Sequence, residues 1–150
     1  MKRNYFLISL LAVLTLSICT ECSSNPKKKN PPPTHGKIVY LTEKEFNSKV
    51  YAPNSTNYLG EYPCIVDFSA SWCGPCLQMA PHLSDLAVIY KSDLIIYNVD
   101  IDKQKELAKR FKIKSIPSLL YIPMKGKPFV QLGYKSKKEL KENIKKHLLK

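Results

Sequence analysis

A continuous apolar segment that ends just before two closely spaced cysteines limits the folds open to this chain more than any other feature. The segment Cys64–Ala70 is apolar except for Asp67 and one serine, a composition typical of a strand buried on both faces of a sheet. Cys73 and Cys76 follow after two intervening residues, and from there apolar side chains recur every three or four positions up to Tyr90. The sequence therefore predicts a buried strand, a short turn and a helix, with a cysteine pair where the helix begins.

The residues around this unit alternate between strand and helix patterns. Thr42 followed by Glu45 predicts a capping box at the start of a short helix. The order βαβαβαββα predicts an α/β domain with a mixed central sheet covered by helices on both faces. The predicted strands are Ile38–Leu41, Cys64–Ala70, Leu94–Val99, Ser118–Ile122 and Pro128–Leu132, and the predicted helices are Thr42–Val50, Cys73–Tyr90, Lys103–Phe111 and Ser136–Leu149.

The first 36 residues differ from the rest and predict a targeting segment followed by a linker. A basic start precedes an apolar stretch over Tyr5–Ile18, which is short for a bilayer span and typical of a signal peptide. We divide the chain into a signal peptide at 1–22, a Pro- and Lys-rich linker at 23–36 and a domain at 37–150. The residues before Cys19 resemble a bacterial lipoprotein processing site, although a small residue is expected where Ile18 stands. Lipid anchoring at Cys19 and ordinary signal-peptidase cleavage both remain open.

The net charge of +12, from 24 Lys and Arg against 12 Asp and Glu, admits nucleic acid, anionic membranes or acidic proteins as partners. Lysines are concentrated in Lys27–Lys29 and Lys135–Lys150. Neither stretch is interleaved with the aromatic side chains on which bases stack. We expect no nucleic-acid partner and interpret the lysines as a solvated tether and a solvated helix face.

The predicted place of Cys73 at a helix N-terminus favours thiol–disulfide exchange. The thiolate is the nucleophile in that reaction, and free backbone N–H groups and the helix dipole stabilise negative charge there. The pKa of Cys73 should therefore be lowered, and Cys76, one turn further along, can close a disulfide with it. Gly74 and Pro75 let the chain turn into the helix, and Trp72 offers an apolar contact to a partner.

A metal site is the main alternative use of the cysteine pair. Cys73 and Cys76 supply two ligands, whereas a structural zinc site takes about four. His82 should lie well around the helix from the cysteines, and we interpret it as a partly exposed polar residue. His35 falls in the linker and His147 in a Lys-rich helix. We therefore expect no metal.

The stretch Val66–Cys76 reads VDFSASWCGPC and is followed by Ala80-Pro81 and, further on, by Ser115–Ser118 with the sequence SIPS. These motifs resemble the thioredoxin family, and the resemblance runs from Lys37 to the C-terminus. The WCGPC motif between a strand and a helix is highly specific for that family.

The resemblance implies a thioredoxin fold in which Cys73 attacks the substrate disulfide and Cys76 resolves the intermediate. It also implies that Pro117 is the family's cis-proline beside the disulfide and that the Ile116 backbone pairs with the substrate chain. Gly133 matches a glycine that keeps the substrate groove open. No cofactor is implied beyond the redox-active disulfide.

Asp67 matches the buried acid that the family places behind its second cysteine, and the residues themselves agree. An aspartate among Ile65, Val66 and Phe68 is unexpected in a buried strand unless it is paired or functional. Desolvation would raise its pKa, so that it could accept and return a proton for Cys76. The alternative is an Asp67 that points to water.

One residue, Asn98, departs from the family pattern, and one cysteine, Cys64, is additional to it. Many thioredoxins carry a lysine near the buried acid, and Asn98 occupies that place here. Without a cation the pKa of Asp67 should rise further. Cys64 is a third cysteine of the domain, which we interpret as a small core residue, with a regulatory or intermolecular thiol as the alternative.

The resemblance and the leader together predict an exported bacterial enzyme that reduces protein disulfides in the periplasm or cell envelope. Its partners would be disulfide-containing envelope proteins and a membrane-embedded electron donor or acceptor. The Gly-Pro dipeptide resembles reducing family members, whereas an oxidising compartment favours an oxidase or isomerase, so the direction stays open.

Three other functions are open to such a chain. A reductant for cytochrome c maturation usually carries an insertion after the strand here predicted at Leu94–Val99, and the sequence leaves no room for it. A metal-binding module and a client-binding module on the same scaffold are the non-enzymatic alternatives. Loss of one motif cysteine would support a binding module, and both cysteines are present.

Overall fold

The structure is a computed structural model that describes residues 36–149. The predicted signal peptide at 1–22 and all of the predicted linker except Gly36 lie outside the described residues. The strands are β1 (Val39–Tyr40), β2 (Cys64–Ser69), β3 (Ile95–Asp100), β4 (Ser118–Ile122) and β5 (Phe129–Leu132). The helices are α1 (Glu43–Lys49), α2 (Gly74–Ile89), α3 (Lys105–Arg110) and α4 (Lys137–Asn143), the last followed by a π-helical turn over Ile144–Leu148.

The five strands form one mixed sheet in the order β1-β3-β2-β4-β5. The central strand β2 runs parallel to β3, with Asp67 opposite Asn98, and antiparallel to β4, with Asp67 opposite Leu119. Five of the six residues of β2 are fully buried, as expected for a strand with neighbours on both edges and helices on both faces. This arrangement determines at which end of the sheet the chain leaves β2 and forms the turn that carries the two cysteines.

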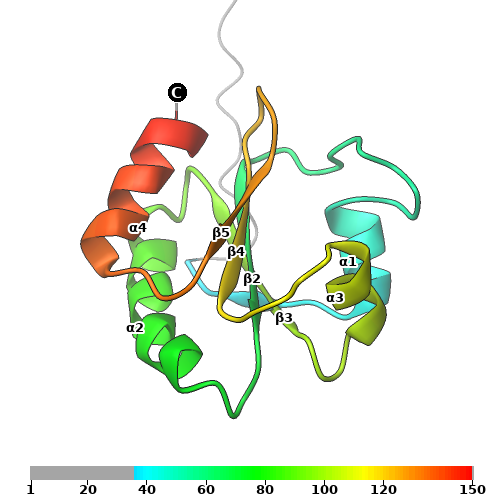
Figure 1. Cartoon of the computed structure of the whole chain (residues 1–150). Coiled ribbons are helices and arrows are strands. Elements are labelled where there is room, and N and C mark those ends of the chain that lie inside the picture. The colour runs from blue at the N-terminus through cyan, green and yellow to red at the C-terminus, as the bar shows by residue number, and fades with distance from the viewer. Residues whose placement is uncertain (1–35, 150) are drawn as a thin grey trace, which may run out of the picture.

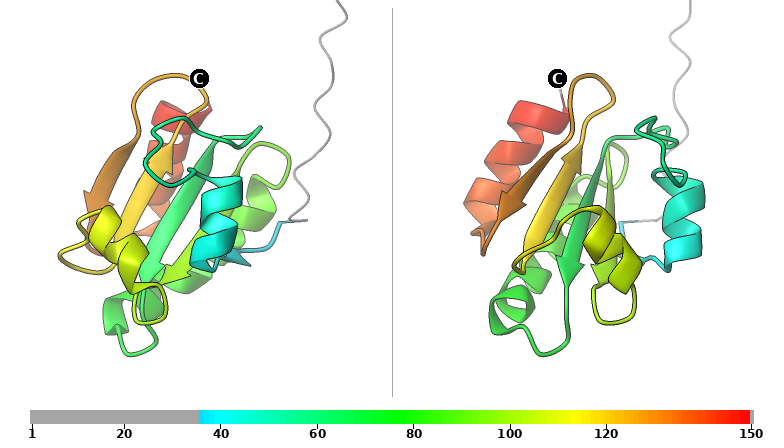
Figure 2. Two further views of the ribbon diagram at one scale, coloured as in Figure 1. Left: turned by 90° about the vertical axis from the view of Figure 1, so that its right-hand side faces the viewer. Right: turned by 45° about the vertical axis from the view of Figure 1, so that its right-hand side comes forward.

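Helices cover both faces of the sheet, as the element order predicts. Figures 1 and 2 show α2 and α4 on one face and α1 and α3 on the other. Each face has its own hydrophobic core because successive side chains of a strand point to opposite sides. Ile65 packs with Met79 and Leu83 of α2, whereas Val66 and Phe68 pack with Phe46 of α1 and Leu107 of α3.

Capping boxes start the first and last helices. The Thr42 hydroxyl accepts the Glu45 N–H and the Glu45 carboxylate accepts the Thr42 N–H, as predicted. Ser136 and Glu139 make the same reciprocal pair at α4. A side-chain cap satisfies backbone donors that have no partner within the helix, so both starts are set by local sequence.

Most element ends differ from the predictions by one or two residues, and two elements illustrate why. The strand predicted at Ile38–Leu41 is only Val39–Tyr40, because Thr42 caps α1 and the chain turns away from β3 after Leu41. The helix predicted at Ser136–Leu149 is α4 plus the π-helical turn. Three of its apolar residues, spaced four apart, are nevertheless all buried: Leu140, Ile144 and Leu148.

The loop between α1 and β2 is held to α3 by one side chain. Arg110 donates to the Asn47 side chain at 2.9 Å and to the Ala52 carbonyl at 2.7 Å. Its guanidinium also lies over the Phe46 and Phe111 rings.

Within residues 36–149 no helix is long and apolar enough to cross a bilayer.

Candidate active site

The cysteine pair lies at the start of α2, where the sequence predicts it. Cys73 is the N-cap residue, and its Sγ accepts the backbone N–H of Cys76 at 3.3 Å. The two cysteines form a disulfide with their Cα atoms 5.2 Å apart, and each is 4% exposed. The first turn of this 16-residue helix carries no acidic residue. Once reduced, a thiolate at Cys73 would face free N–H groups and the positive end of the helix dipole.

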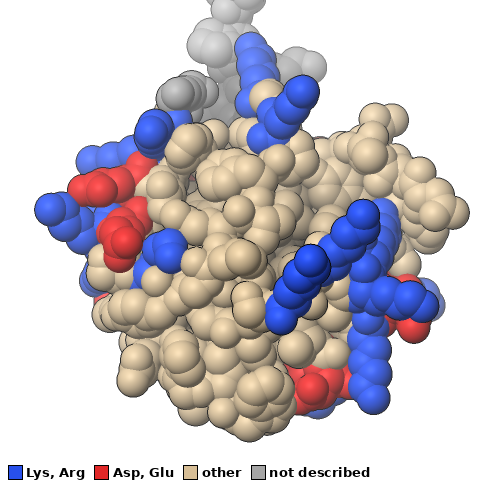
Figure 3. All heavy atoms as spheres, in the orientation of Figure 1, with Lys and Arg blue, Asp and Glu red and all other residues tan. Residues whose placement is uncertain are grey.

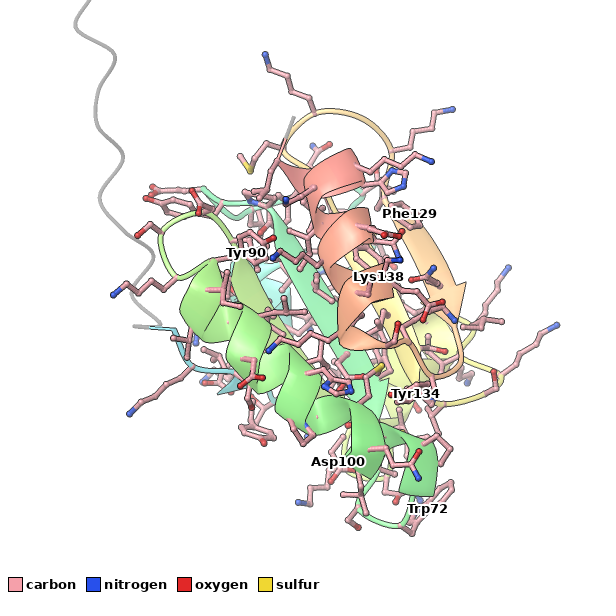
Figure 4. The ribbon with its side chains drawn as sticks, turned by 90° about the vertical axis from the view of Figure 1, so that its left-hand side faces the viewer. Trp72, Tyr90, Asp100, Phe129, Tyr134 and Lys138 are labelled. Atoms are coloured by element: carbon pink, nitrogen blue, oxygen red, sulfur yellow. A yellow bond between two sulfur atoms is a disulfide. The ribbon has the colours of Figure 1, made fainter. Side chains whose placement is uncertain are left out.

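Exposed residues surround the buried sulfurs. Trp72 is 68% exposed and its indole N–H donates to the Asp102 carboxylate at 2.7 Å. Gly74 and Pro75 are also exposed, and a side chain at Gly74 would meet no atom within 4 Å. In Figure 4 Trp72 lies at the end of the molecule where α2 begins, far from Tyr90 at the other end of that helix. A polypeptide can therefore reach this end of α2 without displacing any element.

Two segments form the second wall of the site. One precedes β4 and contains Ile116 and Pro117, and the other follows β5 and begins with Gly133. The Ile116–Pro117 peptide bond is cis, and Ile116 packs against Ala70, Cys73 and Cys76. The Gly133 N–H donates to the Pro117 carbonyl at 2.8 Å. Gly133 has φ +77°, a conformation that glycine adopts without a steric cost. The tertiary structure thus brings Ile116, Pro117 and Gly133 to the cysteines.

Asp67 is buried behind the site with an incomplete set of hydrogen bonds. It is 4% exposed, and its Oδ2 accepts from Asn98 Nδ2 at 3.0 Å while its Oδ1 has no partner. Asn98 Nδ2 also donates to Ser69 Oγ at 2.7 Å. Burial raises the pKa of Asp67 to about 7, and the Asn98 hydrogen bond lowers it only in part. The carboxyl group can therefore exchange a proton near neutral pH.

Asp67 and Cys76 line the same cavity, of about 350 Å³. Asn98 and Ser69 contribute to its polar side, and Tyr40, Leu77 and Ala80 are among its other lining residues. A space of this size with polar groups on one side can hold several water molecules. Such water could carry a proton between the Asp67 carboxyl and the Cys76 thiol.

The remaining candidate residues lie away from this site, or their burial makes their side chains unreactive. Cys64 is fully buried in the hydrophobic core, and burial raises its pKa to about 12. This supports its interpretation as a core residue, because a protonated thiol without solvent access is a poor nucleophile. His82 is partly exposed and lies 3.2 Å from the Tyr134 hydroxyl. Within residues 36–149 no cluster of three His, Cys, Asp or Glu could hold a metal.

Three parts of the site are not predicted from the sequence. Ser69 has a signal that could have found it, because residues two apart on a strand share a face, and Asp67 is two residues before it. Asp102 has no such signal, since its contact with Trp72 spans 30 residues. Lys135 is predicted only as part of a solvated helix face. In the structure its Nζ is 4.0 Å from the position that a Cβ atom would take if Gly133 had a side chain.

Comparisons with known proteins agree with this geometry. The family model described as Thioredoxin matches residues 37–146. A thioredoxin of Borreliella burgdorferi is 35% identical over 99 residues, which cover 64% of this chain and 85% of the relative. A thioredoxin of Staphylococcus aureus is 35% identical over 112 residues, which cover 74% and 98%.

The structural comparison supports the fold. Chloroplastic thioredoxin z, known from a crystal structure, superposes with a TM-score of 0.64 at 21% identity, over 73% of this chain and 93% of that one. The predicted thioredoxin fold is thereby confirmed. With a matching family model, relatives of known family and a Cys-x-x-Cys disulfide, this chain belongs to the thioredoxin family and is a thiol–disulfide oxidoreductase.

Proposed function

We propose that this protein is exported and reduces protein disulfides in a bacterial cell envelope by dithiol exchange through Cys73 and Cys76. The observation that carries the chemistry is the placement of Cys73 as the N-cap of α2, with Cys76 in disulfide contact one turn further on. The export step rests on the leader-like composition of residues 1–22.

The reaction has two exchanges. The Cys73 thiolate attacks one sulfur of the substrate disulfide, forms a mixed disulfide and releases the other substrate sulfur as a thiolate. The Cys76 thiol then loses its proton and attacks Cys73 Sγ, which closes the Cys73–Cys76 disulfide and releases the second substrate thiolate. The substrate gains two electrons and takes up two protons, and the enzyme dithiol loses both.

Asp67 serves as the proton acceptor for Cys76 in the second exchange. Its support is the cavity that both residues line and a pKa raised by burial to about 7. A base works best when its pKa lies near the working pH. Trp72, Gly74, Pro75, Ile116, Pro117 and Gly133 form the surface that receives the substrate chain.

A membrane-embedded electron donor would have to return the disulfide to the dithiol, because an exported protein is separated from cytosolic reductants. If an electron acceptor takes its place, the same site runs as an oxidase or isomerase. Cys19 is the candidate lipid anchor. The reduction potential of the cysteine pair decides between these directions: reducing thioredoxins lie near about −270 mV and strong oxidants near about −120 mV.

The short connection after β3 disfavours a dedicated role in cytochrome c maturation, since α3 begins at Lys105, five residues after β3 ends at Asp100. A non-catalytic scaffold that binds metal or client proteins is the other alternative. Insulin reduction by dithiothreitol tests the enzymatic proposal, and the full-length protein should accelerate it.

Variants of the two cysteines test the roles. Cys73→Ser should abolish the acceleration because no attacking thiolate remains. Cys76→Ser should accumulate mixed disulfides with clients because the resolving thiol is gone. Capture of clients by Cys73→Ser and not by Cys76→Ser would reverse the two assignments, and an inactive unmodified protein would leave only a binding role.

A further inference from the structure

We propose that the substrate groove selects protein disulfides flanked by acidic residues, through ammonium groups that stand on both of its sides. The inference rests on the proposed function and names the substrate class of the Cys73–Cys76 site. It is carried by Lys135, which is held beside Gly133, and by four exposed lysines on the segment that leads from α3 to Ile116.

Lys135 is held beside Gly133 by the backbone. Its Nζ donates to the carbonyls of Leu132 at 2.8 Å and Tyr134 at 3.1 Å, and it lies 4.0 Å from the place of a Cβ on Gly133. Gly133 is in turn bonded to the carbonyl of Pro117. An ammonium group has three donors, so one remains for an anion that enters the groove.

The segment that starts with α3 leads to Ile116, which lies on the other side of the groove. This segment carries four exposed lysines without an acidic partner within 4 Å among the described residues, and two of them lie within four residues of Ile116. In Figure 3 a band of Lys and Arg side chains crosses this part of the surface, with only small acidic areas beside it. The four lysines are Lys105, Lys109, Lys112 and Lys114.

Two acidic residues near the groove, Asp100 and Asp102, have partners of their own. Asp100 pairs with Lys103 at 3.3 Å and accepts the Asp102 N–H, and Asp102 accepts from Trp72. The α2 helix has no acidic residue before Asp85, which pairs with Lys137 at 2.7 Å. Residues 100–114 carry six cationic against three acidic side chains, so this segment has a net charge of +3.

Exposed charges of this kind act mainly on the rate of encounter, and salt screens them over about 8 Å at physiological ionic strength. An acidic residue close in sequence to the reacting cysteine of a substrate would come within that range. A basic residue at the same place would be repelled. The groove should therefore discriminate by charge although Trp72, Ile116 and Gly133 are neutral.

Three peptides of equal length test this proposal. Each carries one cysteine as a mixed disulfide with 2-mercaptoethanol, flanked at three positions by Asp, Ser or Lys. The reduced full-length protein is mixed with each peptide and its oxidation is followed by the fluorescence of Trp72, the only tryptophan of the chain. We expect the Asp peptide to react about fivefold faster than the Lys peptide at low ionic strength and less than about twofold faster at 0.5 M salt.

Two double variants with the same change in net charge locate the effect. Lys112→Glu with Lys114→Glu should bring the Asp-to-Lys rate ratio to about one or below it. Lys141→Glu with Lys145→Glu, both exposed on the C-terminal helix, should keep the ratio. A ratio of one in the unmodified protein, or an equal loss in both variants, would overturn the proposal. Failure to reduce even the Ser peptide would instead remove the proposed function.

Discussion

Asp67 shows how the environment of one residue can set its chemistry. In water a carboxyl group is fully ionised at pH 7, whereas burial in β2 raises the pKa of Asp67 to about 7. Asn98 supplies one hydrogen bond, and the second carboxylate oxygen has none. The residue therefore costs stability when it is ionised, which is the state in which it could accept a proton.

Asp67→Asn should separate these two effects. Because the folded-state pKa is raised above the unfolded value, the unfolding free energy should fall as pH rises from about 4 to about 7, by about 1.4 kcal/mol per unit at most. The variant should lack this slope and be more stable at pH 8, as measured by urea unfolding of the oxidised protein at pH 5 and pH 8. Equal slopes in both proteins would mean that Asp67 does not titrate in this range.

The same variant should slow the step in which Cys76 attacks the mixed disulfide. We expect a loss of about tenfold or more near pH 7 and a smaller loss at high pH, where hydroxide can deprotonate Cys76 directly. Stopped-flow measurement of mixed-disulfide resolution checks this, and the first exchange at Cys73 serves as the internal control. Slowing of the first exchange alone would contradict the assignment.

The Asn98 hydrogen bond lowers the pKa of Asp67 in part, and its effect can be tested in both directions. Asn98→Lys should lower that pKa by placing a cation beside the carboxylate, and the pH–rate profile of resolution should move to lower pH. Asn98→Leu removes the stabilising hydrogen bond and should move the profile to higher pH. If both variants keep the unmodified profile while folded, Asp67 is a structural residue and the chemistry rests on the helix N-terminus.

At the scale of elements, the end of α3 illustrates a conflict between local geometry and side chain. Lys112 follows the helix with φ 51°, and the Ile113 N–H donates to the Ala108 carbonyl at 2.9 Å. Helices commonly end in this way with glycine at the left-handed position. A lysine is strained there, which costs about 1 kcal/mol.

Lys112→Gly should therefore stabilise the protein by several tenths to about 1 kcal/mol. Lys114→Ala removes the same charge at a position without positive φ and is the matched control. Urea unfolding of both variants at high salt, where charge effects are screened, measures the backbone contribution. Equal stability changes in the two would show that charge and not conformation is responsible.

At the scale of the whole molecule, residues 36–149 complete a sheet, both helical layers and every residue of the proposed site. The three hydrophobic clusters of this packing are formed by residues within 36–149. Deletion of 1–22 should therefore leave a folded protein that reduces insulin at the unmodified rate. Circular dichroism and the insulin assay check this, and loss of folding would show that the leader is structural.

Lipid attachment is tested on the full chain by Cys19→Ala. If Cys19 is the anchor, the variant should leave the membrane fraction while its insulin activity in vitro is kept. Membrane association that persists in Cys19→Ala would remove Cys19 as the anchor.

Local sequence determined much of this protein. The apolar β2 segment, the capping box at Thr42 and the periodicity of α2 predict those elements because the causes act within a few residues along the chain. Together with the WCGPC motif they also led to the fold, to the cysteine pair and to the helix N-terminus on which Cys73 lies.

The tertiary structure decided what depends on residues far apart in sequence. The Asp67–Asn98 hydrogen bond spans 31 residues and requires β2 and β3 to pair in register. The contact between Trp72 and Asp102, and the place of Lys135 beside Gly133, depend equally on how separate segments meet. The pKa of Asp67 is raised to about 7 because packing buries the carboxyl group, and the Asn98 hydrogen bond offsets only part of this effect. Sequence could thus name the reacting residues, whereas burial and register set their proton affinity and the charges around them.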